Sequence, residues 1–124
     1  MKGMKNMKNF KGGSLEINLS KEGNKNVMQW HGQSVDRSPS VVLNPYLDSL
    51  INDLKGTELI VDFMKLEYMN SSTVPPIIQF LKNIDASGIT TTITYDAKSK
   101  WQAASFKALE TLSLMMNNIT VTGK

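Results

Sequence analysis

Apolar and polar residues alternate along the first patterned stretch of this sequence. Leu15, Ile17 and Leu19 are separated by single polar residues, which is the period of a strand with one buried face. A second run rich in β-forming residues extends from Val27 to His31, and the polar segment 21–26 between the runs contains the turn-forming pair Gly23-Asn24. The pattern therefore predicts an N-terminal β-hairpin.

A helical period replaces the alternation after a loop at residues 32–40. Ser38 followed by Pro39 is typical of a helix entry. Pro45 is compatible only with a first helical turn, so we expect regular helix to begin near residue 43 or 44 and to end at Gly56. The apolar face predicted for this helix consists of Leu43, Leu47, Leu50, Ile51 and Leu54.

The second half of the sequence alternates between strand-like and helix-like runs. Leu59 to Phe63 is nearly continuous apolar sequence, typical of a strand in the interior of a sheet and covered on both faces. Ile89 to Tyr95 predicts another strand, and Ile119 with Val121 indicates a short last one. One helical stripe is Ile77, Ile78, Leu81 and Ile84, and the next is Trp101, Ala104, Ser105, Ala108, Leu112 and Met115.

The predicted elements follow the order β-β-α-β-α-β-α-β, which indicates an α/β fold with right-handed crossovers. A length of 124 residues with 40% apolar content is typical of one domain with one core. The sequence contains no cysteine, which excludes disulfides and thiolate chemistry. No segment resembles a signal peptide or a membrane span, so we expect a cytoplasmic protein without a membrane partner.

The formal charge of +3 comes from the N-terminus. Four of the fourteen basic residues are Lys2, Lys5, Lys8 and Lys11, and the rest of the chain has ten basic and eleven acidic residues, a net charge of −1. We therefore expect residues 1–13 to be a flexible basic leader and residues 14–124 to be the folded domain. Because the basicity belongs to the leader, the charge does not indicate a nucleic-acid partner.

The candidate functional segment joins the apolar strand 59–63 to the helix that follows residue 75. Hydroxyl groups cluster in Asn70-Ser71-Ser72-Thr73, where free amides and a helix dipole can favour a phosphoryl group, although such residues are also common as simple helix caps. Pro75 and Pro76 disfavour helical angles in the residues before them. Regular helix should therefore begin near Pro75 or Pro76, with Ser71 exposed in an extended or irregular lead-in.

Other polar residues allow structural interpretations. Asp62 lacks the acidic partners of a phosphoryl-accepting aspartate and is expected to bond loop amides at the end of the sheet. Ser49 lies in an Asp-Ser-Leu triplet like that of acyl carriers, but we expect a solvent-facing helix residue. The single histidine, His31, cannot form a metal cluster and is expected on an edge strand, so we predict neither a metal nor a cofactor. Trp101 is expected to pack on the sheet or contact a partner, and the methionines beyond the leader to fill core gaps.

The segment 59–73 resembles the STAS domain of anti-sigma-factor antagonists and sulfate-transporter tails, and the resemblance covers roughly residues 14–122. The family pattern is an apolar strand, a short turn, an aromatic residue, an apolar residue and then Asp-Ser-Ser-Gly. In this chain Asn70 stands in place of the Asp and Thr73 in place of the Gly. A family Gly-x-x-Asp pattern after the second strand has an offset counterpart that includes Gln33 and Asp36. Residues 101–109 are similar to a bacterial subgroup of small stand-alone STAS-like regulators.

The resemblance implies a single STAS-like domain with a mixed sheet, an N-terminal hairpin and helices mainly on one face. It implies a non-enzymatic partner-switching regulator, a monomer or weak homodimer, whose Ser71 is phosphorylated by a GHKL-type serine kinase of the anti-sigma kind and dephosphorylated by a PP2C-type phosphatase. Ser72 is the second choice of phosphosite, and Asn70, Ser71, Ser72, Thr73, Gln33 and Asp36 are the expected partner-binding residues.

Two other functions are compatible with the residues. One is a phosphorylation-independent interaction module or a small-molecule sensor, with a pocket between residues 70–73 and the loop 32–40. The other is an enzyme, but hydrolytic chemistry would need a general base near Ser71, and the sequence indicates none.

Overall fold

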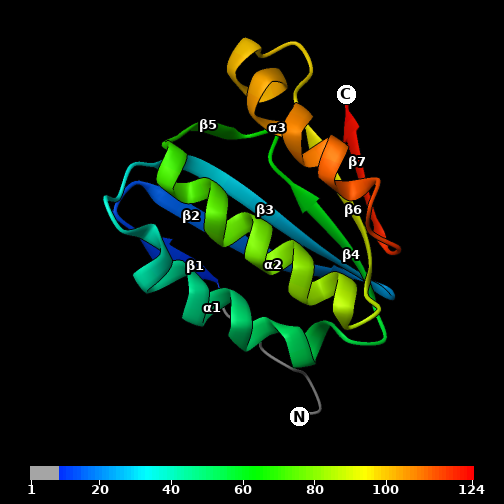
Figure 1. The fold of residues 1–124 in the computed structure, drawn as a ribbon. Coiled ribbons are helices and arrows are strands. Elements are labelled where there is room, and N and C mark those ends of the chain that lie inside the picture. Colours follow the sequence, from blue (N-terminus) through cyan, green and yellow to red (C-terminus); the bar gives the residue numbers. More distant parts are fainter. Residues whose placement is uncertain (1–8) are drawn as a thin grey trace.

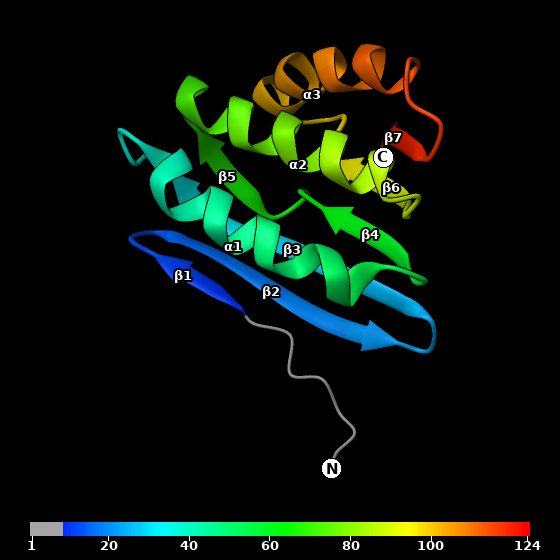
Figure 2. The same cartoon turned by 60° about the horizontal axis from the view of Figure 1, so that its bottom comes forward.

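Three helices lie on one face of a seven-stranded mixed sheet in this computed structural model, which describes residues 9–124 (Figures 1 and 2). The strands are β1 (Phe10–Gly12), β2 (Leu15–Glu22), β3 (Lys25–Ser34), β4 (Glu58–Asp62), β5 (Leu66–Met69), β6 (Thr90–Tyr95) and β7 (Ile119–Gly123). The helices are α1 (Pro39–Leu54), α2 (Val74–Ala86) and α3 (Lys100–Ser113), and a 3-10 turn, η1 (Ser71–Thr73), precedes α2. The predicted α/β class and the helices on one face are confirmed.

The sheet has the strand order β1-β2-β3-β4-β6-β7, and β5 pairs with β3 beyond the end of β4. The first three strands are antiparallel, whereas β4, β5, β6 and β7 are added in parallel pairings. Each helix connects two parallel strands, and the strand order β3-β4-β6-β7 advances in one direction across the sheet. Because such crossovers are right-handed, α1, α2 and α3 all cover the same face. The predicted order omitted two short strands, β1 and β5.

Strand β1 shortens the predicted leader. Phe10, Lys11 and Gly12 pair with Ile17, Glu16 and Leu15 of β2, so the sheet begins before residue 14. Phe10 also packs against Tyr46 of α1, with ring centroids 5.2 Å apart. Backbone pairing and this aromatic contact are the reasons why the end of the predicted leader is part of the fold, and residues 1–8 lie outside the described range.

The hairpin of β2 and β3 is confirmed, with a tighter turn than residues 21–26. The two strands continue to Glu22 and from Lys25, and these two residues are paired. Gly23 has a φ of 64°, and no residue other than glycine has a positive φ in the described range. A glycine at the first of two central positions is typical of a type II′ turn, whose twist matches that of the flanking strands.

A bulge bends β3 at Gly32, so that the strand continues where the sequence predicted a loop. The pairing with β5 changes register between Gly32 and Gln33. Gly32 has a φ of 82°, and a Cβ atom at this position would lie 2.0 Å from the main-chain oxygen of Ser14. Only glycine fits this close approach of two backbones. The bulge lets the end of β3 reach β5 and, beyond it, η1.

Helix α1 begins at Pro39, earlier than expected, and contains Pro45 in its interior. The prediction was wrong because it treated Pro45 as incompatible with a preceding turn. Pro45 cannot donate to the carbonyl of Val41, but both residues are exposed, so water can hydrate that carbonyl. The face predicted to be apolar is right for Leu43, Leu47, Leu50 and Leu54, which are buried.

The core lies between the helices and the sheet, and an aromatic cluster fills its α3 side. Phe63 stands 5.1 Å from Trp30 and 4.6 Å from Phe106, measured between ring centroids. The stripe predicted for α3 was wrong, because the buried residues of this helix are Gln102, Phe106, Leu109 and Ser113. Met115, predicted in the core, is 85% exposed.

Strand β4 lies in the interior of the sheet, as expected, but it is not covered on both faces. Leu59 and Val61 are buried under the helices, whereas Ile60 and Asp62 on the other face are only partly buried. The reason is that the helices cover one face. His31 is also not on an edge, because β3 has neighbours on both sides.

Tyr46 provides a pH-dependent test of the packing between α1 and β1. Burial raises the pKa of the Tyr46 phenol from its ordinary value of 10 to about 12, because desolvation disfavours the phenolate. The raised pKa stabilises the folded state in full below pH 10, and this contribution is lost as the pH rises through 12. We expect spectrophotometric titration to show a phenol with a pKa of about 12 that is missing from Tyr46→Phe and retained in Tyr68→Phe. The same late ionisation in Tyr46→Phe would contradict this assignment.

Candidate functional site

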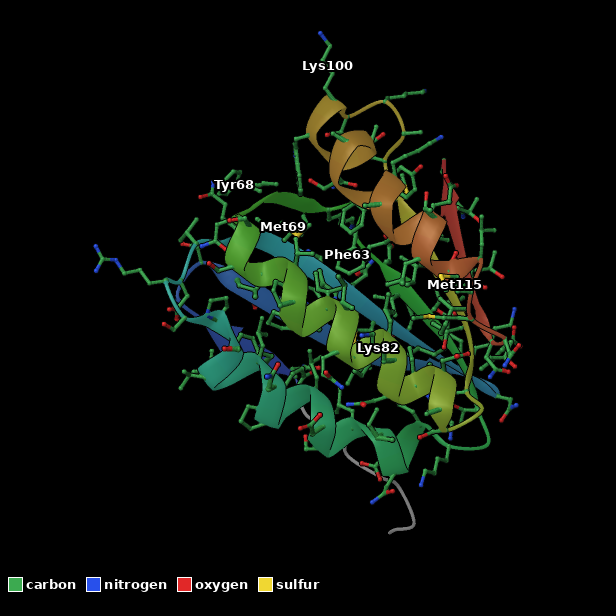
Figure 3. The ribbon with its side chains drawn as sticks, viewed as in Figure 1. Phe63, Tyr68, Met69, Lys82, Lys100 and Met115 are labelled. Carbon is green, nitrogen blue, oxygen red and sulfur yellow. The ribbon has the colours of Figure 1, made fainter. Side chains whose placement is uncertain are left out.

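The candidate site is the junction between β5 and α2, at the carboxyl end of β3. Strand β5 ends with Tyr68, which is 48% exposed, and Met69, which is buried beneath α2 (Figure 3). Asn70 has an extended backbone and is followed by the 3-10 turn Ser71–Thr73. The turn leads into α2 without a break, so the four residues of the predicted functional segment connect β5 directly to α2.

Two of these four residues are turned inward and hold the turn in place. Thr73 is fully buried, and its Oγ1 donates to Oδ1 of Asn70 at 2.7 Å. The Oγ of Ser34 in β3 lies 2.7 Å from the same Thr73 oxygen. The main-chain N–H of Asn70 donates to the carbonyl of Ser34 at 2.9 Å. These bonds fix the turn to the end of β3.

Asn70 also connects the turn to the loop after β3. Its Nδ2 donates to the main-chain oxygen of Asp36 at 2.7 Å. The Asp36 carboxylate accepts from the N–H of Ser38 at 2.9 Å, just before α1 begins. The two residues by which this chain differs from the family pattern, Asn70 and Thr73, are therefore hydrogen-bonded to each other and are part of one network. Thr73 offers no surface to a partner.

The other two residues, Ser71 and Ser72, are exposed. Regular helix begins at Val74, after both serines but slightly earlier than Pro75, and the lead-in is a 3-10 turn and not an extended segment. Val74 adopts helical angles before a proline because its N–H donates to Ser71 in the turn. The prolines occupy the first turn of α2, where a missing N–H costs little. The exposure predicted for Ser71 is confirmed.

Gln33 and Asp36 lie beside this junction on exposed positions. Gln33 is the second-to-last residue of β3, and its Nε2 lies 3.5 Å from Oε1 of Glu67 in β5. Asp36 reaches the site through its main-chain bond to Asn70. The structure thus brings the six predicted residues to one region, with Ser71, Ser72, Gln33 and Asp36 on its surface.

Sequence reasoning missed two residues that build the site. Ser34 is 3% exposed and anchors the turn, and nothing in its sequence neighbourhood marks it. Gln102 is 1% exposed, and its side chain bonds the backbone at both ends of the segment that precedes β5. Its position four residues before Phe106 and seven before Leu109 was a helical signal that could have identified it as buried.

The other candidates have structural roles. Asp62 accepts from the N–H of Met64 at 2.8 Å, which confirms the predicted bond to a loop amide. Ser49 is exposed, as expected, and donates to the carbonyl of Tyr46. Trp101 is half-buried beside Phe106 and Tyr68. Within residues 9–124, no group of three potential metal ligands comes together, and no helix is long and apolar enough to cross a membrane.

The arrangement of three helices on one face of a mixed sheet is the STAS-like fold of solved anti-sigma factor antagonists. The resemblance is structural, since the sequence matches no family model and no curated protein.

Three solved structures illustrate the likeness. An anti-sigma factor antagonist from Mycobacterium paratuberculosis has a TM-score of 0.62 and 11% identity over 86% of each chain. A chain in the complex of the diguanylate cyclase SiaD with its activator SiaC from Pseudomonas aeruginosa has a TM-score of 0.65 and 14% identity, over 94% of this chain and 98% of that one. The anti-sigma factor antagonist SpoIIAA in its unphosphorylated form has a TM-score of 0.52 and 16% identity, over 73% and 82%.

Proposed function

We propose that this protein is a non-enzymatic, cytoplasmic regulator of the partner-switching type. It binds a protein partner through the surface around Ser71, and phosphorylation of Ser71 weakens that contact. Ser72, Gln33 and Asp36 belong to the same surface, and Asn70 holds the backbone beneath it through its bonds to Asp36 and Thr73.

The observation that carries the proposal is that two polar residues of the segment 70–73 face the interior and two face solvent. Thr73 and Asn70 use their polar groups inside the fold, whereas Ser71 and Ser72 present theirs to solvent. A kinase can therefore reach Ser71 without breaking the network that holds the turn. The same network keeps the surface in one conformation before and after modification.

The two prolines determine how a phosphate on Ser71 would act. A helix N-terminus normally binds a phosphate through its free N–H groups. Pro75 and Pro76 remove two of these donors from the first turn of α2. A phosphate on Ser71 is therefore weakly neutralised by its own helix and remains a charge of about −1.5 to −2 facing the partner. Such a charge opposes binding by desolvation and by repulsion of acidic groups.

The proposed enzymes of the cycle are a GHKL-type serine kinase of the anti-sigma kind, which is also the binding partner, and a PP2C-type phosphatase. The shared fold with two anti-sigma factor antagonists, one of them solved in its unphosphorylated form, supports this assignment.

A second candidate partner is a diguanylate cyclase. The likeness to a chain of the SiaD–SiaC complex covers 94% of this chain and 98% of that one, which supports the same kind of partner contact for this chain. In this version the Ser71 surface binds and activates the cyclase, and phosphorylation releases it.

Phosphorylation mapping tests the proposal. We expect the cognate GHKL-type kinase, incubated with ATP and the purified chain, to add one phosphate, which peptide mass spectrometry places on Ser71. Ser71→Ala should abolish the modification, whereas the matched variant Ser72→Ala should keep it. Phosphate on another residue, or on Ser71→Ala to the same extent, would contradict the assignment of Ser71.

A further inference from the structure

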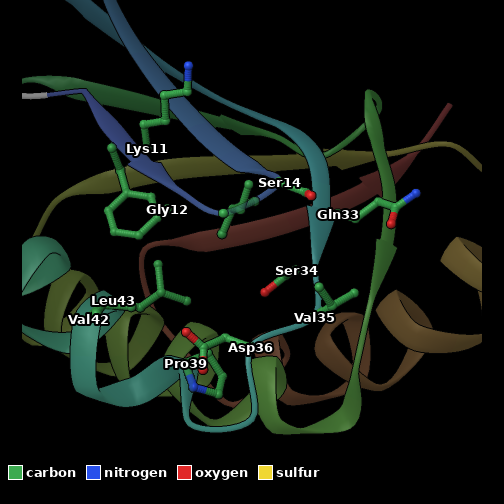
Figure 4. Close-up of a pocket in the computed structure, with 13 residues that line it drawn as sticks. Lys11, Gly12, Ser14, Gln33, Ser34, Val35, Asp36, Pro39, Val42 and Leu43 are labelled. Carbon is green, nitrogen blue, oxygen red and sulfur yellow. The ribbon is translucent and has the colours of Figure 1, made fainter.

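A cavity of about 280 Å³ lies beside the Ser71 surface, between β1, the end of β3 and the first turn of α1 (Figure 4). Gly12 at the end of β1 and Gly13-Ser14 in the turn to β2 line it, and none of these residues has a large side chain. Its walls are mainly apolar. They are formed by Phe10, Leu15, Val35, Pro39, Val42 and Leu43.

The size of the cavity restricts its ligand. Sites for drug-sized molecules have volumes of roughly 300–1,000 Å³. A cavity of about 280 Å³ therefore suits a smaller body, such as a single aromatic ring or a short branched alkyl chain. The apolar walls favour a body without polar atoms, because burying such atoms without partners costs free energy.

The hydrogen-bond network of the site determines which polar group the cavity accepts. Asn70 donates its amide N–H to the carbonyl of Asp36, so its Oδ1 faces Thr73 and must accept. Thr73 donates its only hydroxyl proton to that oxygen. Its Oγ1 can then only accept from Ser34, and the proton of Ser34 is committed to Thr73. The oxygen of Ser34 therefore offers only lone pairs to a ligand.

The polar and charged groups around the cavity also favour a ligand that donates hydrogen bonds. The hydroxyl oxygen of Ser34 is directed into the cavity, and the Asp36 side chain stands at its lower rim (Figure 4). The Lys11 side chain extends away from the cavity in the same view. Lys11, Ser14 and Gln33 also line the cavity, but the acceptor oxygen of Ser34 and the carboxylate of Asp36 both favour a donor and, best of all, a cation.

We propose that this cavity binds a small amphipathic amine, with an apolar body between β1 and α1 and an ammonium group at Ser34 and Asp36. The ligand would contact the same Ser34 that fixes the turn through Thr73 and Asn70. Binding therefore reaches the backbone next to Ser71 without a direct contact. The cavity shares Gln33 and Asp36 with the proposed partner surface, but binding of the amine does not depend on phosphorylation.

A pair of isosteric probes tests the inference on the purified full chain. 2-Phenylethylamine and 3-phenylpropanoate have the same ring and a similar length but opposite charges at neutral pH. We expect the amine to give saturable changes in the amide NMR signals of Gly12, Gly13, Val35 and Asn70. We expect the carboxylate to bind much more weakly, since at the proposed ammonium position it would face the Asp36 carboxylate and the acceptor oxygen of Ser34.

Two variants and one control identify the site. Val42→Trp fills the cavity and should remove saturable binding of 2-phenylethylamine. Val41→Trp places the same bulk on the same helix, at an exposed residue that does not line the cavity, and should leave binding unchanged. Asp36→Asn keeps the acceptor for the Ser38 N–H but loses the charge, so affinity for the amine should fall about two- to fivefold.

Three results would overturn the inference: no saturable change with the amine, equal binding of the two probes, or unchanged binding in Val42→Trp. All these measurements use unphosphorylated protein without a kinase. Their failure would therefore leave the proposed role of Ser71 untouched, and failure of phosphorylation would leave the amine site untouched.

Discussion

Phosphorylation of Ser71 is expected to lower the affinity for the protein partner about 100-fold, which corresponds to a loss of about 3 kcal/mol. The reason is that the new charge stands on an exposed turn whose following helix lacks two N–H donors. Ser71→Asp carries a smaller charge and should lower affinity by about tenfold, or roughly 1.4 kcal/mol. Ser71→Ala should bind like the unmodified protein. Isothermal titration calorimetry with the partner kinase or cyclase measures all four forms.

The matched control for charge is Ser20→Asp. Ser20 is exposed on β2 and pairs with Val27, toward the end of the sheet opposite to Ser34, so an added carboxylate there should not alter partner binding. The circular dichroism spectrum should be the same for all variants, because the network around Thr73 is intact in each. Equal affinity of Ser71→Ala, Ser71→Asp and the phosphoprotein would rule out control through this residue.

The largest expected loss of stability follows from Gln102→Leu. The Gln102 Nε2 donates to the carbonyls of Phe63 and Leu66, each at 2.8 Å, and its Oε1 accepts from the N–H of Asp96 at 2.8 Å. Leucine has nearly the same size but leaves the Leu66 carbonyl and the Asp96 N–H without this partner, whereas the Phe63 carbonyl keeps its bond from the N–H of Leu66 at 3.0 Å. Each buried unsatisfied group costs about 1–3 kcal/mol, so we expect the free energy of unfolding to fall by roughly 2–6 kcal/mol. Urea denaturation measures this change.

Gln79→Leu is the matched control for this substitution. Gln79 is exposed on α2 and bonds only the side chain of Asn83 among the contacts described, so the same change there should alter stability by no more than about 0.5 kcal/mol. If Gln102→Leu unfolds at the same urea concentration as Gln79→Leu, the three bonds do not hold β5 and α3 together in solution.

The spacing of apolar residues along the sequence was sufficient to predict most of the fold. The alternation around Leu15, Ile17 and Leu19 gave the hairpin, and Ile77, Leu81 and Ile84 lie on the buried face of α2 as expected. Strand β5 was missed because four residues are too few to show a period. The face of α3 was misassigned because a buried glutamine is satisfied by distant backbone groups, which no local pattern reveals.

The candidate site was predictable at its surface and not in its interior. The hydroxyl cluster and the two prolines correctly placed Ser71 outside regular helix and in solvent. The same cluster did not reveal that Asn70 and Thr73 face inward, because their orientation depends on Ser34, which is 39 residues before Thr73. The chain folds so that this contact forms only when β3 and β5 pair.

Strand β3 also affects the order in which the molecule can assemble. Its pairing with β2 closes only a two-residue turn. Its parallel pairing with β4 closes a much longer loop, since Gln29 and its partner Asp62 are 33 residues apart in the sequence. Long loops lose more chain entropy on closure, so the hairpin can form early and act as a template for the parallel strands. During synthesis the hairpin also leaves the ribosome before strands β4 to β7. The turn that contains Ser71 is bonded to Ser34, the last residue of β3, so we expect a kinase that recognises the geometry of this turn to modify only folded molecules.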